Sequence, residues 1–435
     1  MRRYPVTRLQ EAVIEVERSH TPWNVQFEAA TTATLDAERL AAAARTACGT
    51  YPAAKARLRP VDGDPPYEWV LPDAPPEIPV EVVDGDDADL AAVRRRFYGK
   101  RFDLAVEPPL SLLVIRGDGE AGGDRLCACA SHVSMDGIGV FRVFQALLAA
   151  YRGEEPTAAT LEGTPREVLD GVRPRGAARR LRLLGSTARR LGYFLDSPAR
   201  PVGSGPSGSA WTGWWFADRH LDADATARLV ADRPAGVTVN DVLLAALHLT
   251  VDRWNAARGA PADRISLLMP TNVRPEGRFY DGVGMYTLFD SVDTGPRHRR
   301  DQATALERVA DRTDRIKAAD RQFGYLEWWH LFSAVAPPAV RRRVAPQVFG
   351  PGEPLLDTAV LSNLGRVPEP GGLPDGDLLR PWLTPPCWPP TPLSVGVLTV
   401  GDRLHLGFRF ERSVFDAGDA EAFADRYRER LEGMV

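Results

Sequence analysis

The chain has 435 residues, of which 44% are hydrophobic and 26% charged, and its formal net charge is −4. This length is too great for a single compact core and predicts two domains of ordinary size. The composition is that of a soluble globular protein, and the slightly negative charge argues against a general nucleic-acid binder. No stretch approaches the ~20 apolar residues of a membrane span, and no apolar segment follows the basic N-terminus, so we expect a cytoplasmic protein. The four cysteines include no Cys-x-x-Cys pair, and no metal site is expected.

The first half of the chain alternates between helical and strand patterns. We predict an alanine-rich helix over 35–46, a loop rich in Pro, Asp and Gly over 60–88, and a strand over 110–115. A second apolar strand follows at 126–130, and two of its residues, Cys127 and Cys129, alternate toward one face. Free cysteine is among the most buried residue types, so this face is expected to lie in the core.

A basic helix is predicted over 177–195. It carries an apolar stripe that consists of Leu181, Leu184, Ala188, Leu191 and Leu195. We interpret its basic face as a solvated surface. The alternatives are a site for the phosphates of coenzyme A, for an acidic carrier protein or for a membrane surface.

A segment rich in Pro, Gly and Ser follows the basic helix and predicts a linker over 197–210. We therefore expect an N-terminal lobe over 1–196 and a C-terminal lobe over 211–435. The C-terminal lobe shows its own strand and helix signals. These are a core strand that begins with Trp211, Trp214, Trp215 and Phe216, a Thr238/Asp241 capping box before a buried helix over 242–251, an alternating strand over 404–410, and a final helix with an apolar stripe over 423–434.

The most informative stretch of the chain is Ser131–Gly137. His132 follows the end of an apolar strand, and Asp136 and Gly137 open a helix whose apolar side chains recur from Val140 to Tyr151. This placement puts one imidazole at the edge of a sheet. Imidazole is the side chain whose ordinary pKa lets it take and return a proton near pH 7, so His132 is a candidate general base.

The pattern His-x-x-x-Asp-Gly resembles that of acyltransferases built on the chloramphenicol acetyltransferase fold. These include the condensation domains of nonribosomal peptide synthetases, wax ester synthases and polyketide-associated acyltransferases. Further segments resemble the family in the same order along the chain, from about residue 8 to the C-terminus. They are Phe102-Asp103-Leu104 with Pro108-Pro109-Leu110, Thr238–Leu247, Pro270–Pro275, Val283–Tyr286 and Leu361–Gly365.

The resemblance implies an α/β fold of two lobes, each a mixed β-sheet with flanking helices, and an active-site channel between them. It also implies that His132 is the base and that Asp136 forms a structural salt bridge, for which Arg274 is the predicted partner. The amide of Gly137 is a candidate oxyanion donor. Ser131, Ser362 and Asn363 are further candidate oxyanion or substrate contacts. The other histidines, which have no motif around them, are interpreted as structural or surface residues: His20, His220, His248, His298, His330 and His405.

Three positions depart from the condensation-domain pattern. Ser131 stands where such domains carry a first histidine, Lys55 replaces an arginine, and Gly284–Phe289 lacks the asparagine of the family segment. These departures argue against an ordinary peptide-bond-forming domain.

The predicted function is that of a stand-alone acyltransferase in natural-product or lipid biosynthesis. It would move an acyl or aminoacyl group from a thioester, carried by coenzyme A or by the phosphopantetheine of a carrier protein, to an amine or alcohol, with no bound cofactor. The alternatives are a wax-ester-like enzyme that uses acyl-CoA, another reaction of a tethered intermediate such as cyclisation, and a non-catalytic recruitment module. We expect a monomer with no nucleic-acid partner.

Overall fold

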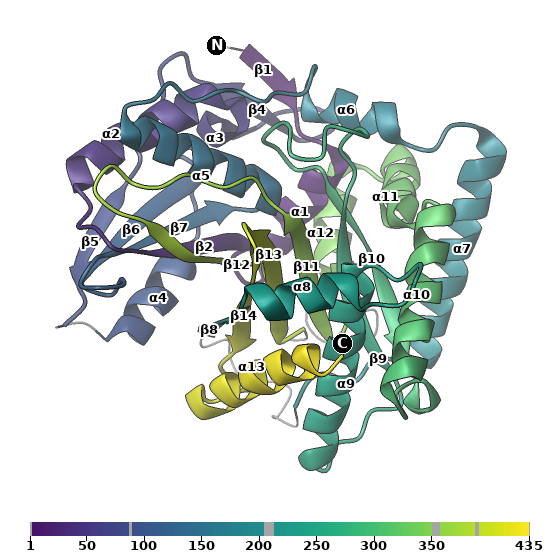
Figure 1. The fold of residues 1–435 in the computed structure, drawn as a ribbon. Coiled ribbons are helices and arrows are strands. Elements are labelled where there is room, and N and C mark those ends of the chain that lie inside the picture. Colours follow the sequence, from purple (N-terminus) through teal and green to yellow (C-terminus); the bar gives the residue numbers. More distant parts are fainter. Residues whose placement is uncertain (1, 87–88, 204–212, 350–356, 388–390, 435) are drawn as a thin grey trace.

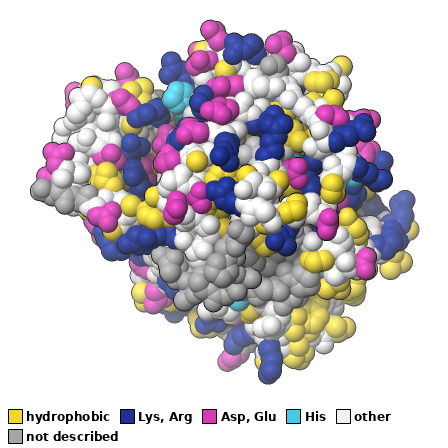
Figure 2. All heavy atoms as spheres, turned by 90° about the horizontal axis from the view of Figure 1, so that it is seen from below, with side chains coloured by type: hydrophobic (Ala, Val, Ile, Leu, Met, Phe, Trp, Pro, Cys, Tyr) yellow, Lys and Arg dark blue, Asp and Glu magenta, His cyan; other side chains and the backbone are white. Residues whose placement is uncertain are grey.

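Two mixed β-sheets with helices packed against them form the body of the molecule (Figure 1). The computed structural model describes residues 2–86, 89–203, 213–349, 357–387 and 391–434. Within these residues no helix is both long and apolar enough to cross a membrane. On the face seen from below, basic, acidic and hydrophobic side chains are intermixed (Figure 2).

The first sheet has five strands in the spatial order β12-β2-β7-β6-β5. They are β2 (Asn24–Thr31), β5 (Val80–Asp84), β6 (Leu110–Arg116), β7 (Arg125–Ser131) and β12 (Leu378–Thr384). Helices α2 (Ala37–Thr50) and α5 (Gly137–Arg152) cover one face, and α4 (Leu90–Tyr98) covers the other (Figure 1). Along β7, Leu126 and Ala128 pack toward α5, while Cys127 and Cys129 are buried on the side of α4, as the alternation predicts.

The second sheet has six strands in the order β10-β9-β11-β13-β14-β8. They are β8 (Trp214–Leu221), β9 (Ile265–Asn272), β10 (Thr287–Thr294), β11 (Ala359–Arg366), β13 (Leu393–Val400) and β14 (Arg403–Glu411). The largest core cluster lies between this sheet and its helices, which are α8 (Ala223–Ala231), α9 (Val239–Ala257), α10 (Gln302–Ala318) and α13 (Ala417–Glu432). The predicted capping box is present, since Thr238 and Asp241 cap α9 reciprocally.

The remaining elements surround these two layers. A three-stranded sheet is formed by β1 (Arg2–Pro5), β3 (Arg57–Pro60) and β4 (Tyr67–Leu71). The other helices are α1 (Arg8–Ser19), α3 (Pro52–Lys55), α6 (Pro165–Val172), α7 (Ala177–Asp196), α11 (Gly324–Val335) and α12 (Pro338–Phe349), with short 3-10 turns at Pro296–His298 and Arg321–Phe323. The prediction of a loop over 60–88 is wrong, because β4 and β5 lie within it. Strand β4 pairs with β1 and β3, and β5 pairs with β6. A local sequence pattern does not reveal these pairings.

The apolar stripe predicted on the basic helix is not its buried face. Leu181 and Leu195 of α7 are 68% and 61% exposed, whereas Leu183 and Phe194 are buried. Two polar residues also face inward: Thr187 is buried, and Arg190 forms an ion pair with Asp290 of β10. The helix therefore docks through a face that hydrophobic periodicity alone does not mark.

The two sheets do not divide the chain at a single point, because β12 comes from the C-terminal half and pairs with β2 of the first sheet. On its way it crosses β13 and β14 where Gly396 and Gly407 lie opposite each other. A Cβ atom on either glycine would overlap the backbone carbonyl of Leu383. The predicted lobe boundary at 197–210 stays a prediction, and residues 204–210 lie outside the described part of the chain.

We predict that Gly396→Ala lowers the free energy of unfolding by about 1–3 kcal/mol, because backbone and not a flexible side chain must give way. Denaturant unfolding of the purified protein measures this change. The matched control is Gly192→Ala in α7, where a Cβ atom meets nothing within 4 Å; this helical substitution is expected to be neutral or slightly stabilising. Equal stability of Gly396→Ala and wild type would contradict the crossing argument.

Candidate active site

His132 is held at the end of β7 by backbone hydrogen bonds. Its N–H donates to the Trp23 carbonyl oxygen at 2.8 Å, which extends the contact of β7 with β2 by one residue. The chain then turns, with the Ser134 N–H donating to the Ser131 carbonyl at 3.2 Å, and α5 begins at Gly137. The strand and helix that flank the turn are both buried, so the position of the imidazole is fixed from both sides.

The imidazole of His132 is arranged to be a base. Its Nδ1 lies 3.0 Å from the Met135 carbonyl oxygen. A carbonyl only accepts, so Nδ1 carries the hydrogen and Nε2 keeps a lone pair. Burial lowers the pKa of His132, and the Met135 carbonyl and the Asp136 charge, which favour the cation, do not offset it. The ring, which stacks on Trp23 with 6.3 Å between centroids, is therefore neutral at pH 7.

Asp136 accepts hydrogen bonds on both carboxylate oxygens, and none of them comes from the His132 imidazole. Arg274 Nη1 and Nη2 each donate to it at 2.9 Å. The other donors are the Gly139 N–H at 2.8 Å, the Tyr286 N–H at 3.0 Å and the Thr287 hydroxyl at 3.1 Å. Burial alone would raise the pKa of Asp136, but the Arg274 charge and these donors hold it below its ordinary value.

Arg274 is equally well satisfied. Its guanidinium also donates to the Asp281 carbonyl at 2.8 Å, the Gly282 carbonyl at 3.1 Å and the Asn272 side-chain oxygen at 3.1 Å. The side chains of Arg274 and Asp136 are 0% and 1% exposed. The predicted ion pair is thus present, and it ties the N-terminus of α5 to the segment between β9 and β10.

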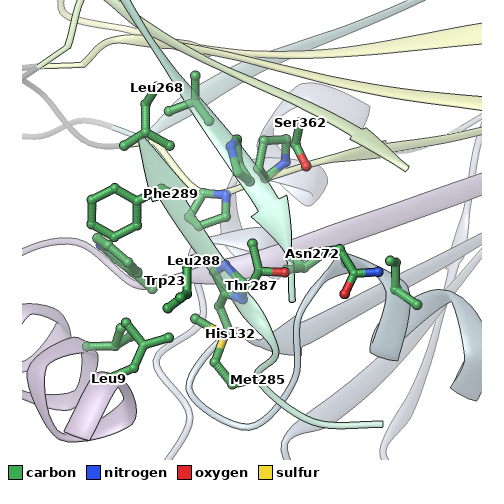
Figure 3. Close-up of a pocket in the computed structure, with 18 of the residues that line it drawn as sticks. Leu9, Trp23, His132, Leu268, Asn272, Met285, Thr287, Leu288, Phe289 and Ser362 are labelled. Carbon is green, nitrogen blue, oxygen red and sulfur yellow. The ribbon is translucent and has the colours of Figure 1, made fainter. Parts of the chain in front are cut away.

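An apolar cavity of about 160 Å³ opens beside His132 (Figure 3). Figure 3 shows His132 near Thr287 and Met285, with Leu268 and Phe289 farther along the wall. Helix α1 and strands β9, β10 and β11 supply most of the lining. Such a mainly apolar recess with a few polar groups is typical of a small-molecule site.

The structure brings most of the predicted site residues to this cavity. Gly137, Ser362 and Asn363 line it together with His132. A Cβ atom on Gly137 would lie 3.3 Å from Leu364 Cδ2, so the glycine leaves the cavity open there. As the first residue of α5, Gly137 has an N–H with no acceptor inside the helix. Ser131 is different, because it is buried and does not line the cavity.

Several cavity residues were not among the predicted site residues, although Asn272 and Thr287 lie in segments that resemble the family. Asn272 and Thr287 face each other across β9 and β10 next to His132, and Asp357 and Tyr325 line another part of the wall. Strand alternation along β10 identifies Thr287, Phe289 and Ser291 as one face, but it does not say which face meets the histidine.

We predict that Arg274→Ala lowers the free energy of unfolding by about 3–5 kcal/mol, because it leaves the buried Asp136 carboxylate without its counter-charge. Denaturant unfolding of both proteins checks this value. The control is Arg300→Ala, whose ion pair with Asp301 is exposed and should contribute less than about 1 kcal/mol. A similar loss of unfolding free energy in the two variants would show that the buried ion pair contributes no more to stability than the exposed one.

Comparison with known proteins identifies relatives in sequence and in fold. No family model matches the sequence. The uncharacterized protein Rv2305 of Mycobacterium tuberculosis is 30% identical over 438 aligned residues, which cover 98% of each chain. The corresponding protein of a second strain of that species, MT2362, matches equally.

Solved structures share the fold at low identity. The first condensation domain of the CDA synthetase has a TM-score of 0.70 at 16% identity and covers 100% of this chain and 96% of its own. The EpoB cyclization-docking bidomain from Sorangium cellulosum gives 0.69 at 18% identity, covering 99% and 85%. The starter condensation domain of rhizomide synthetase RzmA, in complex with C8-CoA, gives 0.66 at 14%, covering 99% and 94%. The chain therefore belongs to one family with Rv2305, and its fold is that of the condensation domains.

Proposed function

We propose that the protein is an acyltransferase that moves an acyl group from a thioester to an amine or alcohol, with His132 as general base. The observation that carries this proposal is the neutral imidazole beside an apolar cavity, with Nδ1 engaged by the Met135 carbonyl and Nε2 left with its lone pair. A base in this state can accept the proton that the attacking acceptor loses.

The reaction needs no covalent enzyme intermediate. The acceptor nitrogen or oxygen attacks the thioester carbonyl while its proton passes to Nε2 of His132. The tetrahedral oxyanion collapses, the carbon–sulfur bond breaks, and the thiolate takes the proton back from the imidazolium. The Gly137 N–H at the start of α5 is the proposed oxyanion donor, helped by the positive end of the helix dipole. The Ser362 hydroxyl and the Asn363 amide are further candidates on the cavity wall.

Asp136 and Arg274 are positioning residues in this scheme. Both oxygens of Asp136 are taken up by Arg274, Gly139, Tyr286 and Thr287, so the carboxylate is not a hydrogen-bond partner of His132. The ion pair instead keeps Gly137 and His132 in place against the opposite wall of the cavity.

The proposed donor is a thioester of coenzyme A or of a carrier-bound phosphopantetheine. Two points support an acyl thioester: the apolar lining of the cavity, and the fold shared with a starter condensation domain that was solved in complex with C8-CoA. We propose natural-product or lipid biosynthesis as the setting, with lobes over 1–196 and 211–435 meeting at the cavity.

The first test compares wild type with His132→Ala on a panel of acyl-CoA and carrier-bound thioesters with mixed amine and alcohol acceptors. Thiol release and product mass are measured. We expect acceptor-dependent turnover that falls at least ~100-fold in the variant, the lower range for loss of a general base. His220→Ala, on β8, is the matched control and should retain activity.

Equal rates in wild type and His132→Ala would remove His132 as the base. Binding of a carrier protein with no turnover, and with no effect of His132→Ala, would instead favour a recruitment module.

The pH dependence of the rate gives an independent prediction. Because burial lowers the pKa of His132, the imidazole is already in its neutral, basic form when the pH reaches 7. We expect kcat/KM to rise with pH below 6.5 and to be level from pH 7 upward, as measured with an acceptor alcohol that does not titrate in this range. A rate that rises through pH 7–8 with such an acceptor would contradict a neutral, desolvated imidazole.

A further inference from the structure

We propose that the end of the cavity far from His132 binds a hydroxyl group at the tip of a substrate chain, through Asp357 and Tyr325. The inference rests on the proposed function and deepens it, because it names a feature of the substrate that the cavity selects.

The cavity has a direction that is set by strand register. Asn272 of β9 lies opposite Thr287 of β10, beside His132, and two residues farther along each strand Pro270 lies opposite Phe289. The next pair on the same face is Leu268 with Ser291. From Thr287 to Ser291 the strand advances four residues, or roughly 13 Å at about 3.3 Å per residue.

The polarity of the wall changes along this direction. Between Thr287 and Ser291 the wall is apolar, because Pro270 and Phe289 line the cavity there and Leu268 lies opposite Ser291. Beyond this stretch, Asp357 is the single carboxylate among the described residues that line the cavity, and it is 7% exposed. A charged group at the end of an apolar recess is costly to bury, so it needs partners.

Asp357 has two hydrogen-bond donors, but they do not use all of the acceptor sites on its carboxylate. The Ser266 hydroxyl donates to Oδ1 at 2.5 Å, and the Ser291 hydroxyl donates to Oδ2 at 2.8 Å. A carboxylate offers about four acceptor sites, so further donors can bind. Burial raises the pKa of Asp357 against the opposing effect of the two serines and of Arg190 and Arg264, and an added donor would stabilise its charged form.

Tyr325 supplies a second polar group at this end. Its ring stacks on Phe289 with centroids 5.2 Å apart and lines the cavity. Within the described part of the chain its hydroxyl forms no hydrogen bond. Tyr325, Ser291 and Asp357 line the same cavity, and the Ser291 hydroxyl donates to Asp357 at 2.8 Å.

These two groups suit a hydroxyl better than an ammonium. A hydroxyl can donate to Asp357 and accept from Tyr325, which matches the hydrogen-bonding capacity that the described residues leave on both groups. An ammonium has no acceptor lone pair, so it would leave the Tyr325 hydroxyl without a partner. The far end is therefore a site for a neutral group that both donates and accepts.

The test is a binding measurement on the full-length protein. N-acetylcysteamine thioesters of octanoic, decanoic and dodecanoic acid are compared with their ω-hydroxy and ω-amino forms by calorimetry. At the length that reaches Asp357, we expect the ω-hydroxy thioester to bind about tenfold more tightly than the plain one, as a hydrogen bond to a charged group would give. The ω-amino form should show no such gain.

Two variants locate the effect. Tyr325→Phe removes only the hydroxyl and should reduce the preference for the ω-hydroxy chain about threefold or more. Asp357→Asn keeps the shape but not the charge and should reduce it further. Tyr193→Phe, which removes a hydroxyl from an exposed tyrosine of α7, should leave the preference unchanged.

The inference is overturned by equal binding of plain and ω-hydroxy chains at every length, by tighter binding of the ω-amino chain, or by a hydroxyl preference that survives in both variants. Failure of binding by all chains would overturn it as well. Turnover that depends on His132 without a hydroxyl preference would leave the proposed function intact, whereas a hydroxyl preference without turnover would refute only the proposed function.

Discussion

The buried ion pair of Asp136 and Arg274 is the interaction on which the rest of the site depends. Two charges that are 0% and 1% exposed persist in a protein interior only when each is fully paired and hydrogen-bonded. Here the carboxylate caps α5 through Gly139 and also binds the backbone of Tyr286. Displacing either segment would leave a buried charge unpaired. The requirement for pairing thus fixes α5 against β10, and with it the geometry of the cavity between them.

The pairing of Asp136 with Arg274 also keeps the Asp136 carboxylate from hydrogen bonding to the His132 imidazole. Because Asp136 is saturated by other donors, the His132 Nδ1–H donates instead to the neutral Met135 carbonyl, at 3.0 Å. A carbonyl fixes the tautomer without adding the full negative charge that would raise the pKa of the imidazole. Burial then dominates, and the ring is neutral when a substrate arrives. The five residues from His132 to Asp136 therefore contain both the proposed base and the carboxylate of the ion pair that anchors the turn.

Local sequence patterns predicted the parts of the fold whose causes are local. The capping box at Thr238, the limits of the basic helix and the turn that carries His132 all follow from neighbouring residues. The ordered family segments also pointed to Arg274. The path of β12 was not predictable in this way, because its partner β2 lies about 350 residues away. The far end of the cavity is the same kind of case, since Asp357, Tyr325 and Ser291 meet only through packing.

The crossing of β12 gives the cavity a second connection between the sheets. Leu383 lines the cavity, pairs with Phe27 of β2, and passes over Gly396 and Gly407 of the second sheet. The Asp136–Arg274 ion pair therefore fixes one side of the cavity, and strand β12, which is packed too tightly to shift, fixes another. Protein interiors are close-packed, so this packing resists small displacements of the cavity walls. For the proposed acyl transfer, which forms no covalent enzyme intermediate, two fixed walls would hold the thioester and the acceptor close together, and such proximity can supply much of the rate.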